Sequence, residues 1–600
     1  MSTAAVQTIW CDLLIASLAD AGVVTIVVSP GSRSTPLVAA LAQESRLDVV
    51  TIIDERAAAF FALGVGRATG RPAALICTSG TAAAHYFPAL IEASHAGVPL
   101  LAITADRPPE LQSCGASQTI DQLDLYGDFV RGSFELGAPV GQPLALRAVR
   151  RTVIQAVSLA RGPHPGPVHL EVPLRKPLEP AAPSTAGEHA LVAAALALRG
   201  EARIAPPQLV ADATSIRELA AAIAAEPDGV IIAGALPAGF TRDAVFALAA
   251  RAGYPIIAEA GSQLRFGARP ADVTMLDHAD MIPLGLRPTP RIVVQLGAEP
   301  VAASWPRWLA ALTSPPRPGG SSAGRETDPR SVTTTQRWVL AGATWSDSDS
   351  SARGVVLGDV AAALSATTSA IAGSRGVRTR AWLDTWRDVN ARAEAACARA
   401  IEAAPQSEVA LLRAVLAAVP AHATIQIGNS LPIRVVDHLP GGGAPHTVIT
   451  QRGAAGIDGL IASAAGATRG GAPVLLVLGD VSFAHDLGGL LAARCASQPL
   501  AILVVDNRGG QIFSGLPVAG ANLGAAFERH FVTAPEIDPA MVATALGARA
   551  ATVGSPAAAA TAVAAALATP GVTVIHAPVS VSGAHDVRRA AIELLQGETQ

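Results

Sequence analysis

Short apolar runs alternate with longer segments of helical periodicity along most of this chain. Such runs are typical of strands that are buried on both faces of a parallel sheet. Several of the segments that follow them begin with Ser, Thr or Asp, which favour the first position of a helix. The pattern therefore predicts an α/β fold in which helices connect parallel strands.

The predicted strands fall into three groups. They lie at residues 23–28, 49–53, 73–77, 100–104 and 167–172, then at 229–234, 255–260 and 291–297, and finally at 423–428, 473–479, 500–507 and 573–577. A proline-rich passage at 173–183 ends the first group. The second runs into a Pro-, Gly- and Ser-rich segment at 314–330, which we expect to be a surface loop or a disordered insertion. We therefore predict three doubly wound parallel-sheet domains, covering residues 1–183, 205–345 and 375–600.

Composition excludes several classes of protein. The net charge is −4 and no basic cluster is present, which argues against a nucleic-acid partner. Lys176 is the only lysine, so the chain has no Gly-Lys-Ser/Thr phosphate-binding loop. The five cysteines form no CxxC pair, so neither a zinc ribbon nor a disulfide framework is indicated.

The N-terminal segment and the apolar runs indicate where the protein resides. No basic residue precedes Arg33, so the charged start of a signal peptide is missing. No uninterrupted apolar run reaches the roughly 18 residues that a membrane-spanning helix needs. We expect a soluble, cytoplasmic protein without a membrane partner.

An acidic residue and an amide follow two of the predicted strands in the third group. Asp480 follows PVLLVLG (473–479), and Asn507 closes LAILVVDN (500–507), 27 positions later. The carboxyl ends of parallel strands share one edge of a sheet, where open α/β sheets bind ligands. A carboxylate and an amide oxygen there suit Mg²⁺ that holds a diphosphate. The Asp480 segment alone, or the Asn507 segment alone, also fits an ordinary turn and helix cap.

Asp54 and Glu55 follow the predicted strand at 49–53 and open a helical segment. A carboxylate at this position is favoured by the helix dipole, which is the simpler explanation. The apolar residues around Glu55 also fit a partly buried acid that hydrogen-bonds a cofactor nitrogen.

Arginines and small polar residues follow several strands. Each such loop alone fits a helix cap with a surface arginine, but together they describe a pocket for ligands that carry more than one carboxylate. The segments are SPGSRSTPL (29–37) with Arg33, TSGTAAAH (78–85) with Gly80, ITADRPPELQ (103–112) with Arg107, the nearby Gln118, GNSLPIR (428–434) with Ser430 and Arg434, and QRGAAGIDG (451–459) with Arg452.

The pair of Asp480 and Asn507 resembles the cofactor motif of thiamine-diphosphate enzymes, which usually reads GDG and then NN after 24–27 residues. Val481 and Asp506 depart from that form, while the two expected metal ligands are kept. The loops of the first and third groups, with DERAAAFFALGVG (54–66) and GGQIFSGLP (509–517), are similar to one branch of this superfamily. That branch joins 2-oxoglutarate to isochorismate in menaquinone biosynthesis.

The resemblance implies a role for each candidate residue. It implies thiamine diphosphate and Mg²⁺, with Mn²⁺ as a possible substitute, bound by a pyrimidine-binding first domain and a diphosphate-binding third domain. It also implies a homodimer or homotetramer in which Glu55 faces the partner's Asp480 across a shared cofactor. The implied metal ligands are Asp480, Asn507 and the carbonyl of Gly509; the catalytic acid is Glu55; further cofactor contacts are Gly80, Ser482, Ile512, Phe513 and Leu516; the 2-oxoglutarate side has Ser430 and Arg434; and the isochorismate side has Arg33, Arg107, Gln118 and Arg452.

Two alternatives and one departure stay open at this point. Another thiamine-diphosphate enzyme, such as an acetohydroxyacid synthase or a 2-oxoacid decarboxylase, takes small monoanions and needs fewer arginines. A non-catalytic relative is disfavoured because Glu55, Asp480 and Asn507 are intact. The branch often has a basic residue in the central domain near LGAEPVAAS (296–304), where this chain offers only Arg307 nearby. Either Arg307 substitutes, or isochorismate is held with one charge fewer.

Overall fold

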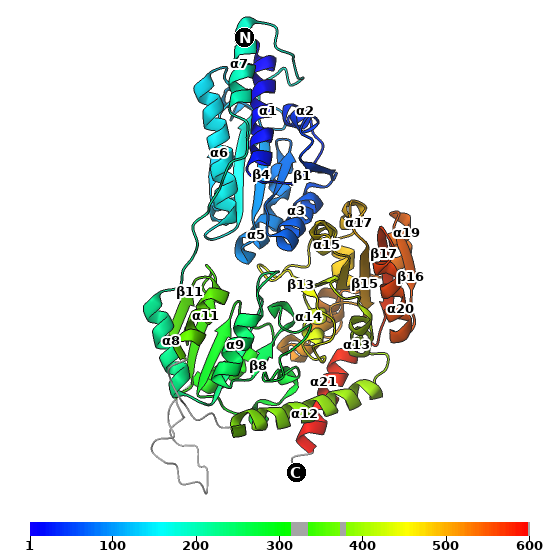
Figure 1. The fold of residues 1–600 in the computed structure, drawn as a ribbon. Helices are drawn as coiled ribbons and strands as arrows, with labels where there is room; N and C mark the ends of the chain where they lie inside the picture. Colours follow the sequence, from blue (N-terminus) through cyan, green and yellow to red (C-terminus); the bar gives the residue numbers. More distant parts are fainter. Residues whose placement is uncertain (314–333, 372–379, 598–600) are drawn as a thin grey trace.

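The computed structural model describes residues 1–313, 334–371 and 380–597, which form three parallel sheets with helices packed around them (Figure 1). The predicted α/β class with three doubly wound sheets is confirmed. The segment 314–330, which we expected to be a loop or insertion, lies outside the described residues. No helix within the described ranges is both long and apolar enough to cross a membrane.

The first sheet has six strands in the order β2-β1-β3-β4-β6-β5. Its central strands are fully buried runs of β-branched and aliphatic residues, as expected for a sheet covered on both faces. The strands are β1 (Thr25–Val28), β2 (Asp48–Thr51), β3 (Ala73–Cys77), β4 (Leu100–Asp106), β5 (Ser133–Glu135) and β6 (Pro167–Pro173). The helices are α1 (Thr3–Asp20), α2 (Thr35–Leu41), α3 (Glu55–Thr69), α4 (Thr81–His85), α5 (Phe87–Ala96), α6 (Pro143–Arg161) and α7 (Ala186–Ala197).

The second sheet has five strands in the order β11-β10-β9-β7-β8. Its strands are β7 (Gly229–Ala233), β8 (Ile256–Ala258), β9 (Ile292–Leu296), β10 (Gln336–Ala341) and β11 (Gly354–Leu357), and its helices are α8 (Ala213–Ala225), α9 (Asp243–Ala252), α10 (Trp305–Thr313) and α11 (Val360–Ile371). Edge strand β11 lies beyond residue 345, where we expected the central domain to end. The sheets alone do not define domain limits, so the three predicted ranges stay predictions.

The third sheet has six strands in the order β13-β12-β14-β15-β17-β16. They are β12 (Thr424–Ile427), β13 (Thr447–Thr450), β14 (Val474–Gly479), β15 (Leu500–Asp506), β16 (Arg549–Thr552) and β17 (Val572–Pro578). The helices of this region are α12 (Arg380–Ala403), α13 (Glu408–Ala418), α14 (Leu431–Val436), α15 (Leu460–Ala467), α16 (Asp480–His485), α17 (Gly489–Ala493), α18 (Ala525–Phe527), α19 (Pro539–Ala545), α20 (Pro556–Leu567) and α21 (Gly583–Gly597).

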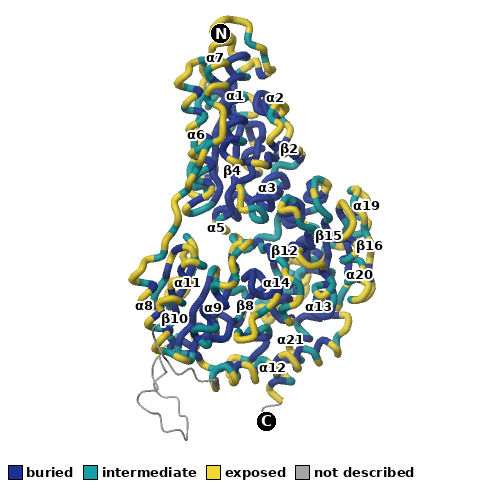
Figure 2. Tube along the Cα trace, viewed as in Figure 1, coloured by how far each residue is buried: buried dark blue, intermediate teal, exposed yellow. Residues whose placement is uncertain are grey.

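Helices α3 and α15 join the first and third sheets through a closely packed contact. A Cβ added to Gly64 would lie 1.9 Å from the carbonyl oxygen of Ser463, and one added to Gly466 would lie 1.9 Å from that of Phe61. The two helix backbones therefore touch where neither residue has a side chain. One continuous cluster of buried apolar residues runs through both helices and both sheets, and the tube in Figure 2 is dark blue along α3.

Candidate active site

The first helix turn after β2 carries Glu55. Asp54 caps α3, because its carboxylate accepts hydrogen bonds from the backbone N–H groups of Arg56 (2.9 Å) and Ala57 (3.4 Å). Glu55 is half-buried in the first turn, where the helix dipole favours a negative charge. Burial raises the pKa of the Tyr86 hydroxyl, and the charge of Glu55 adds to this rise. Glu55 thus lies just beyond the carboxyl end of β2, near enough to Tyr86 for its charge to act there.

Ser79 and Gly80 form the turn between β3 and α4. Gly80 has a φ of 86°, and a Cβ on it would approach the Cγ of Gln118 to 3.0 Å. The Gln118 side chain donates to the carbonyl of Ser79 (3.0 Å), and the Arg107 guanidinium donates to the Ser79 hydroxyl. The structure thus brings Gly80, Arg107 and Gln118 together around one turn.

Arg33 lies beside this turn. Its backbone N–H donates to the Thr78 hydroxyl (3.1 Å), and its Nη1 donates to the carbonyl of Leu174 (2.8 Å). The side chain is only 5% exposed, and its pKa is lowered first by burial and then by the charge of Arg107. Two guanidinium groups held this close in a half-buried place favour a bound anion.

A buried polar network that the sequence analysis missed supports the Gly80 turn. The side chain of Gln122 accepts from the backbone N–H of Gly80 (2.9 Å) and donates to Glu171 (3.2 Å). Thr104 donates to Glu171 and lies 2.7 Å from the ring of His169. Burial, together with the neighbouring charge of Glu171, raises the pKa of Asp106 to about 7. The sequence does contain a signal for this network, because polar residues interrupt the apolar strands LLAITAD and PVHLEVP.

The third sheet places Asp480 and Asn507 at the ends of the adjacent strands β14 and β15, and each side chain is 6% exposed. One carboxylate oxygen of Asp480 accepts the backbone N–H of Gly509 (2.6 Å), and the other accepts that of Val481 (2.9 Å). Burial and the nearby charge of Asp506 raise the pKa of Asp480 to about 6. The three predicted metal ligands, Asp480, Asn507 and Gly509, therefore lie together.

Glu408, at the start of α13, is a second residue that the sequence analysis missed. It is 2% exposed and lies close to the side chain of Asn507 and the backbone of Ala584. Burial and the charge of Asp480 raise its pKa to about 7. In the sequence, Ser407-Glu408 is no different from an ordinary helix start.

These groups fit a divalent cation. Asp480, Asp506 and Glu408 concentrate negative charge in a buried place, and Asn507 and the Gly509 carbonyl add neutral oxygens, which is the donor chemistry of Mg²⁺. In the part of the chain that the structure describes, no group of three or more His, Cys, Asp and Glu side chains could hold a metal. A cation at this site would therefore depend on the amide and backbone oxygens.

The remaining predicted cofactor contacts surround this edge. Ser482 is 3% exposed in α16. Ile512 and Phe513 are half-buried in the short 3₁₀ helix η8 (Gln511–Gly515), and Leu516, which follows it, is exposed. Phe513 packs edge-on against Phe531, with ring centroids 5.5 Å apart. The role of these apolar side chains as cofactor contacts stays a prediction.

Ser430, Arg434 and Arg452 lie together at the carboxyl ends of β12 and β13. Ser430 precedes α14 with a φ of 72°, and its carbonyl accepts from Arg434 (2.6 Å). Arg452 donates to the side chain of Asn429 (3.1 Å). Burial and the charge of Arg452 lower the pKa of Arg434. This is a second arginine pair of the kind that Arg33 and Arg107 form.

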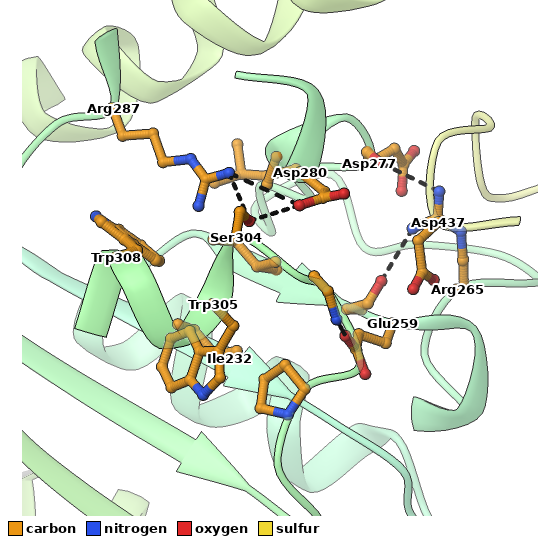
Figure 3. Close-up of a pocket in the computed structure, with 16 residues that line it drawn as sticks. Ile232, Glu259, Arg265, Asp277, Asp280, Arg287, Ser304, Trp305, Trp308 and Asp437 are labelled. Carbon is orange, nitrogen blue, oxygen red and sulfur yellow. Dashed lines mark hydrogen bonds and ion pairs between the residues drawn. The ribbon is translucent and has the colours of Figure 1, made fainter. Parts of the chain in front are cut away.

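A small cavity lies between the second sheet and α14 (Figure 3). Its volume is about 40 Å³, and Glu259, Asp280, Arg287 and Asp437 line it. Arg287 stacks over Trp308 and donates to the Ser304 hydroxyl (3.0 Å). By contrast Arg307, the basic residue we considered for isochorismate, is exposed on α10.

Within the described part of one chain, no hydrogen bond or ion pair links Glu55 to Asp480, Asn507 or Gly509. The predicted residues thus form three groups. One surrounds the Gly80 turn, one surrounds Asp480, and one surrounds Arg434.

Comparisons with known proteins show the class and the family of this chain. Residues 10–125 match the thiamine pyrophosphate enzyme N-terminal TPP binding domain, and residues 435–577 match the corresponding C-terminal TPP binding domain. Benzoylformate decarboxylase from Polynucleobacter necessarius has a similar structure, with a TM-score of 0.68 over 97% of this chain and 99% of that chain. It is 17% identical, so this likeness shows the fold alone. The chain is thus built as a thiamine pyrophosphate enzyme.

Curated relatives show the family within that class. The 2-succinyl-5-enolpyruvyl-6-hydroxy-3-cyclohexene-1-carboxylate synthase of Sorangium cellulosum is 40% identical, and the alignment covers 91% of this chain and 89% of the relative. The synthase of the same name from Myxococcus xanthus is 37% identical over 91% and 90%. The chain belongs to the 2-succinyl-5-enolpyruvyl-6-hydroxy-3-cyclohexene-1-carboxylate synthase family.

Proposed function

We propose that this protein decarboxylates 2-oxoglutarate and adds the resulting four-carbon unit to isochorismate, a step of menaquinone biosynthesis. The observation that carries the proposal is the presence of two arginine pairs, Arg33 with Arg107 and Arg434 with Arg452. In each pair, one guanidinium lowers the pKa of the other. Both substrates are dicarboxylates, so a site with four arginines offers positive charge to the carboxylates of both.

Thiamine diphosphate, when bound, supplies the electron sink for loss of CO₂. Asp480, Asn507 and the Gly509 carbonyl would hold its diphosphate through Mg²⁺, or through Mn²⁺ in its place. The Gly80 turn, Ser482 and the apolar side chains of Ile512, Phe513 and Leu516 would contact its rings. The backbone N–H of Gly80 is already bound to Gln122, so its carbonyl is the group left for the cofactor.

Glu55 would act as the acid that hydrogen-bonds a ring nitrogen of the cofactor. Its half-buried position in the first turn of α3 lets a carboxyl group hold or release a proton beside a bound ring. No hydrogen bond to its carboxylate is formed within the described ranges, so the group is available for a ligand.

The arginines would orient the two substrates. Ser430 and Arg434 would hold the distal carboxylate of 2-oxoglutarate, while Arg33, Arg107, Gln118 and Arg452 would line the isochorismate side. Arginine suits this task because its planar fork binds a carboxylate through two parallel hydrogen bonds. Holding both anions close to the reacting centre is the main contribution of these residues.

The active unit would be a homodimer at least, or a homotetramer, and it would work in the cytoplasm. In such an assembly, Glu55 of one copy would face Asp480 of the other across the shared cofactor.

Product analysis tests the proposal. The protein is incubated with thiamine diphosphate, Mg²⁺ and 2-oxoglutarate, with and without isochorismate, and the products are followed by mass spectrometry. The expected result is an adduct that needs both substrates. Acetolactate formation from pyruvate, without that adduct, would instead assign the chain an acetohydroxyacid synthase activity.

A further inference from the structure

Glu92 links helix α5, which packs on the first sheet, to the loop that follows β13 in the third. Its side chain is buried. One carboxylate oxygen accepts the backbone N–H of Gly453 (2.9 Å), and the other accepts that of Ala454 (2.5 Å). The guanidinium of Arg67, on α3, donates to the same carboxylate. The buried charge is therefore held by one cation and by two main-chain donors from the loop.

The loop lies so close to α5 that position 453 requires glycine. A Cβ on Gly453 would lie 2.6 Å from the carbonyl oxygen of Glu92 and 3.0 Å from the backbone nitrogen of Ala96. Both neighbours are main-chain atoms, which cannot turn away as the end of a flexible side chain could. The path of the loop relative to α5 is therefore fixed at the point where Glu92 binds it.

Side chains, and not a backbone ladder, hold this loop in place. Among the described residues, no backbone–backbone hydrogen bond involves residues 452–456. Asn429, just after β12, donates to the carbonyls of Gln451 (2.7 Å) and Gly456 (2.7 Å). Glu92 binds the same loop from the side of α5. Because the loop has no ladder of its own, the loss of either side chain should allow it to move.

Arg452 lies between these two attachments. Its guanidinium donates to the side-chain oxygen of Asn429 (3.1 Å), and the next residue along the chain is bound by Glu92. We infer that Glu92 is a positioning residue: by holding the loop after β13 against α5, it fixes Arg452 where its guanidinium can bind a carboxylate of isochorismate. The inference rests on the proposed function, because that function assigns Arg452 to the isochorismate side.

A purely structural link between the two sheets is the competing explanation. Its removal would lower stability without distinguishing the two substrates. Glu188 is a control for that role, because it too is buried and accepts from the backbone N–H groups of Ser2 (2.6 Å), Ser184 (2.8 Å) and Thr185 (3.0 Å). It belongs to α7, which lies near the N-terminus and away from α5 (Figure 1).

Glu92→Gln tests the inference by substrate. The amide has one acceptor and one donor end, so it can no longer accept from both N–H groups, and it carries no charge for Arg67. We expect the KM for isochorismate to rise about tenfold, because a displaced Arg452 loses charge-assisted hydrogen bonds. The KM for 2-oxoglutarate and kcat should stay within about threefold. Glu188→Gln should lower the unfolding temperature and change neither KM.

A double variant separates positioning from general damage. If Glu92 acts through Arg452, adding Glu92→Gln to Arg452→Gln should raise the KM for isochorismate by no more than about twofold beyond that of Arg452→Gln alone. Damage to the fold would instead produce the same rise in either background.

Amide hydrogen exchange, followed by mass spectrometry, gives a readout that does not depend on turnover. In Glu92→Gln, we expect the amides of residues 451–459 to exchange at least about tenfold faster, while those of β14 and β15 keep their wild-type rates. If Glu92→Gln does not fold, Arg67→Gln replaces it. That variant keeps both acceptors of Glu92 but removes the cation, so we expect exchange of the loop and the KM for isochorismate to rise about threefold.

Three outcomes for Glu92→Gln would overturn the inference. They are a wild-type KM for isochorismate, an equal rise in KM for both substrates, and a full additional rise in the Arg452→Gln background. Wild-type exchange and KM in Arg67→Gln would overturn it as well. Each of these results leaves the proposed function in place, provided that the wild-type protein forms the adduct of 2-oxoglutarate and isochorismate. Absence of that adduct would reject the proposed function, and this inference with it.

Discussion

The first and third sheets have the same strand order but different charged groups at their carboxyl edges. In each sheet, the second strand in sequence lies at one edge and the last two strands are exchanged at the other. The first edge carries Arg33 and Arg107 beside the acid Asp106, while the third carries Asp480 and Asp506 beside Arg434 and Arg452. The loops and not the sheet therefore determine what each edge can bind.

The same equivalence extends to the helices that join the two sheets. Helix α3 follows the second strand of its sheet, and α15 follows the second strand of the other. These corresponding helices pack on one another at Gly64 and Gly466. The second sheet has a different strand order, and its carboxyl side contributes the small cavity around Glu259 and Arg287 instead of a comparable edge.

Removing the acid of the first edge should have the largest effect. Glu55→Gln keeps the shape of the side chain but cannot hold and release a proton, so we expect turnover to fall by about 10³-fold. Circular dichroism and thermal unfolding should be unchanged, because within the described ranges the Glu55 carboxylate makes no hydrogen bond. A steady-state rate close to that of the wild type would remove Glu55 from its assigned role.

Removing the acid of the third edge should act on binding. Asp480→Ala deletes a charged metal ligand, and we expect the Mg²⁺-dependent affinity for thiamine diphosphate to fall about 100-fold in calorimetry. Asp20→Ala is the control, since Asp20 is also buried but pairs with Arg46 and Arg150. Asp20→Ala should lower the free energy of unfolding and leave the affinity for the cofactor unchanged. Equal losses in the two variants would contradict a specific role for Asp480.

One arginine from each pair should separate the two substrates. Arg434→Gln should raise the KM for 2-oxoglutarate about 30-fold, and Arg33→Gln should do the same for isochorismate, because each loses charge-assisted hydrogen bonds to a carboxylate. The KM for the other substrate should stay within about threefold. Arg175→Gln, in an exposed ion pair with Glu110, should change neither KM. If both variants affect both substrates alike, the assignment of Arg434 and Arg33 fails.

A methyl group at the helix contact should weaken the link between the two edges. Gly466→Ala places a Cβ against the carbonyl of Phe61, and we expect the free energy of unfolding to fall by about 2 kcal/mol in urea titrations. Gly554→Ala is the control, because a Cβ there would meet nothing within 4 Å. Unchanged stability in Gly466→Ala would show that the two helices do not pack in this way.

The smallest expected effect concerns the cavity beside α14. Burial and the charge of Asp437 raise the pKa of Glu259 to about 8, and burial raises that of Asp437 to about 7. The folded-state pKa of each lies above its unfolded value, so its contribution to stability is fully present only below about pH 4 and is lost as the pH rises to about 8. Glu259→Gln has no carboxyl group to ionise at this position, so we expect its free energy of unfolding to rise relative to that of the wild type between pH 5 and pH 9. A loss over that interval in urea titrations would contradict the raised pKa values.

The buried strands could be predicted from the sequence, and most edge strands could not. The predicted strand at 73–77 coincides with β3, and the other eleven predicted strands agree with observed ones to within a few residues. Edge strands β5, β13, β16 and β11 were missed, because they are short and partly exposed and have no continuous apolar run. Strand β10 lies inside its sheet, but Arg337 interrupts the apolar pattern. This arginine is fully buried and pairs with Asp347 (2.5 Å).

The site residues that follow strands could be predicted, and their supporting groups could not. Asp480, Arg33 and Arg434 occur in polar loops directly after apolar runs, which is a local signal. Glu408 lies close to Asn507 although almost a hundred positions separate them, and Gln122 bonds Glu171, which is 49 positions further along the chain. Such pairs depend on tertiary packing, which one sequence does not display. The sharing of the site between two copies rests on resemblance and stays a prediction.

The contact between α3 and α15 also bears on how freely this protein can change. Main-chain atoms meet at Gly64 and Gly466, so the angle between the two sheets is set by backbone and not by side chains that could be exchanged one at a time. Substitutions elsewhere on these helices can alter polarity or bulk without moving the two edges apart. The loops can therefore change in sequence and bind new ligands. The distance between the two sheet edges that carry these loops stays almost the same.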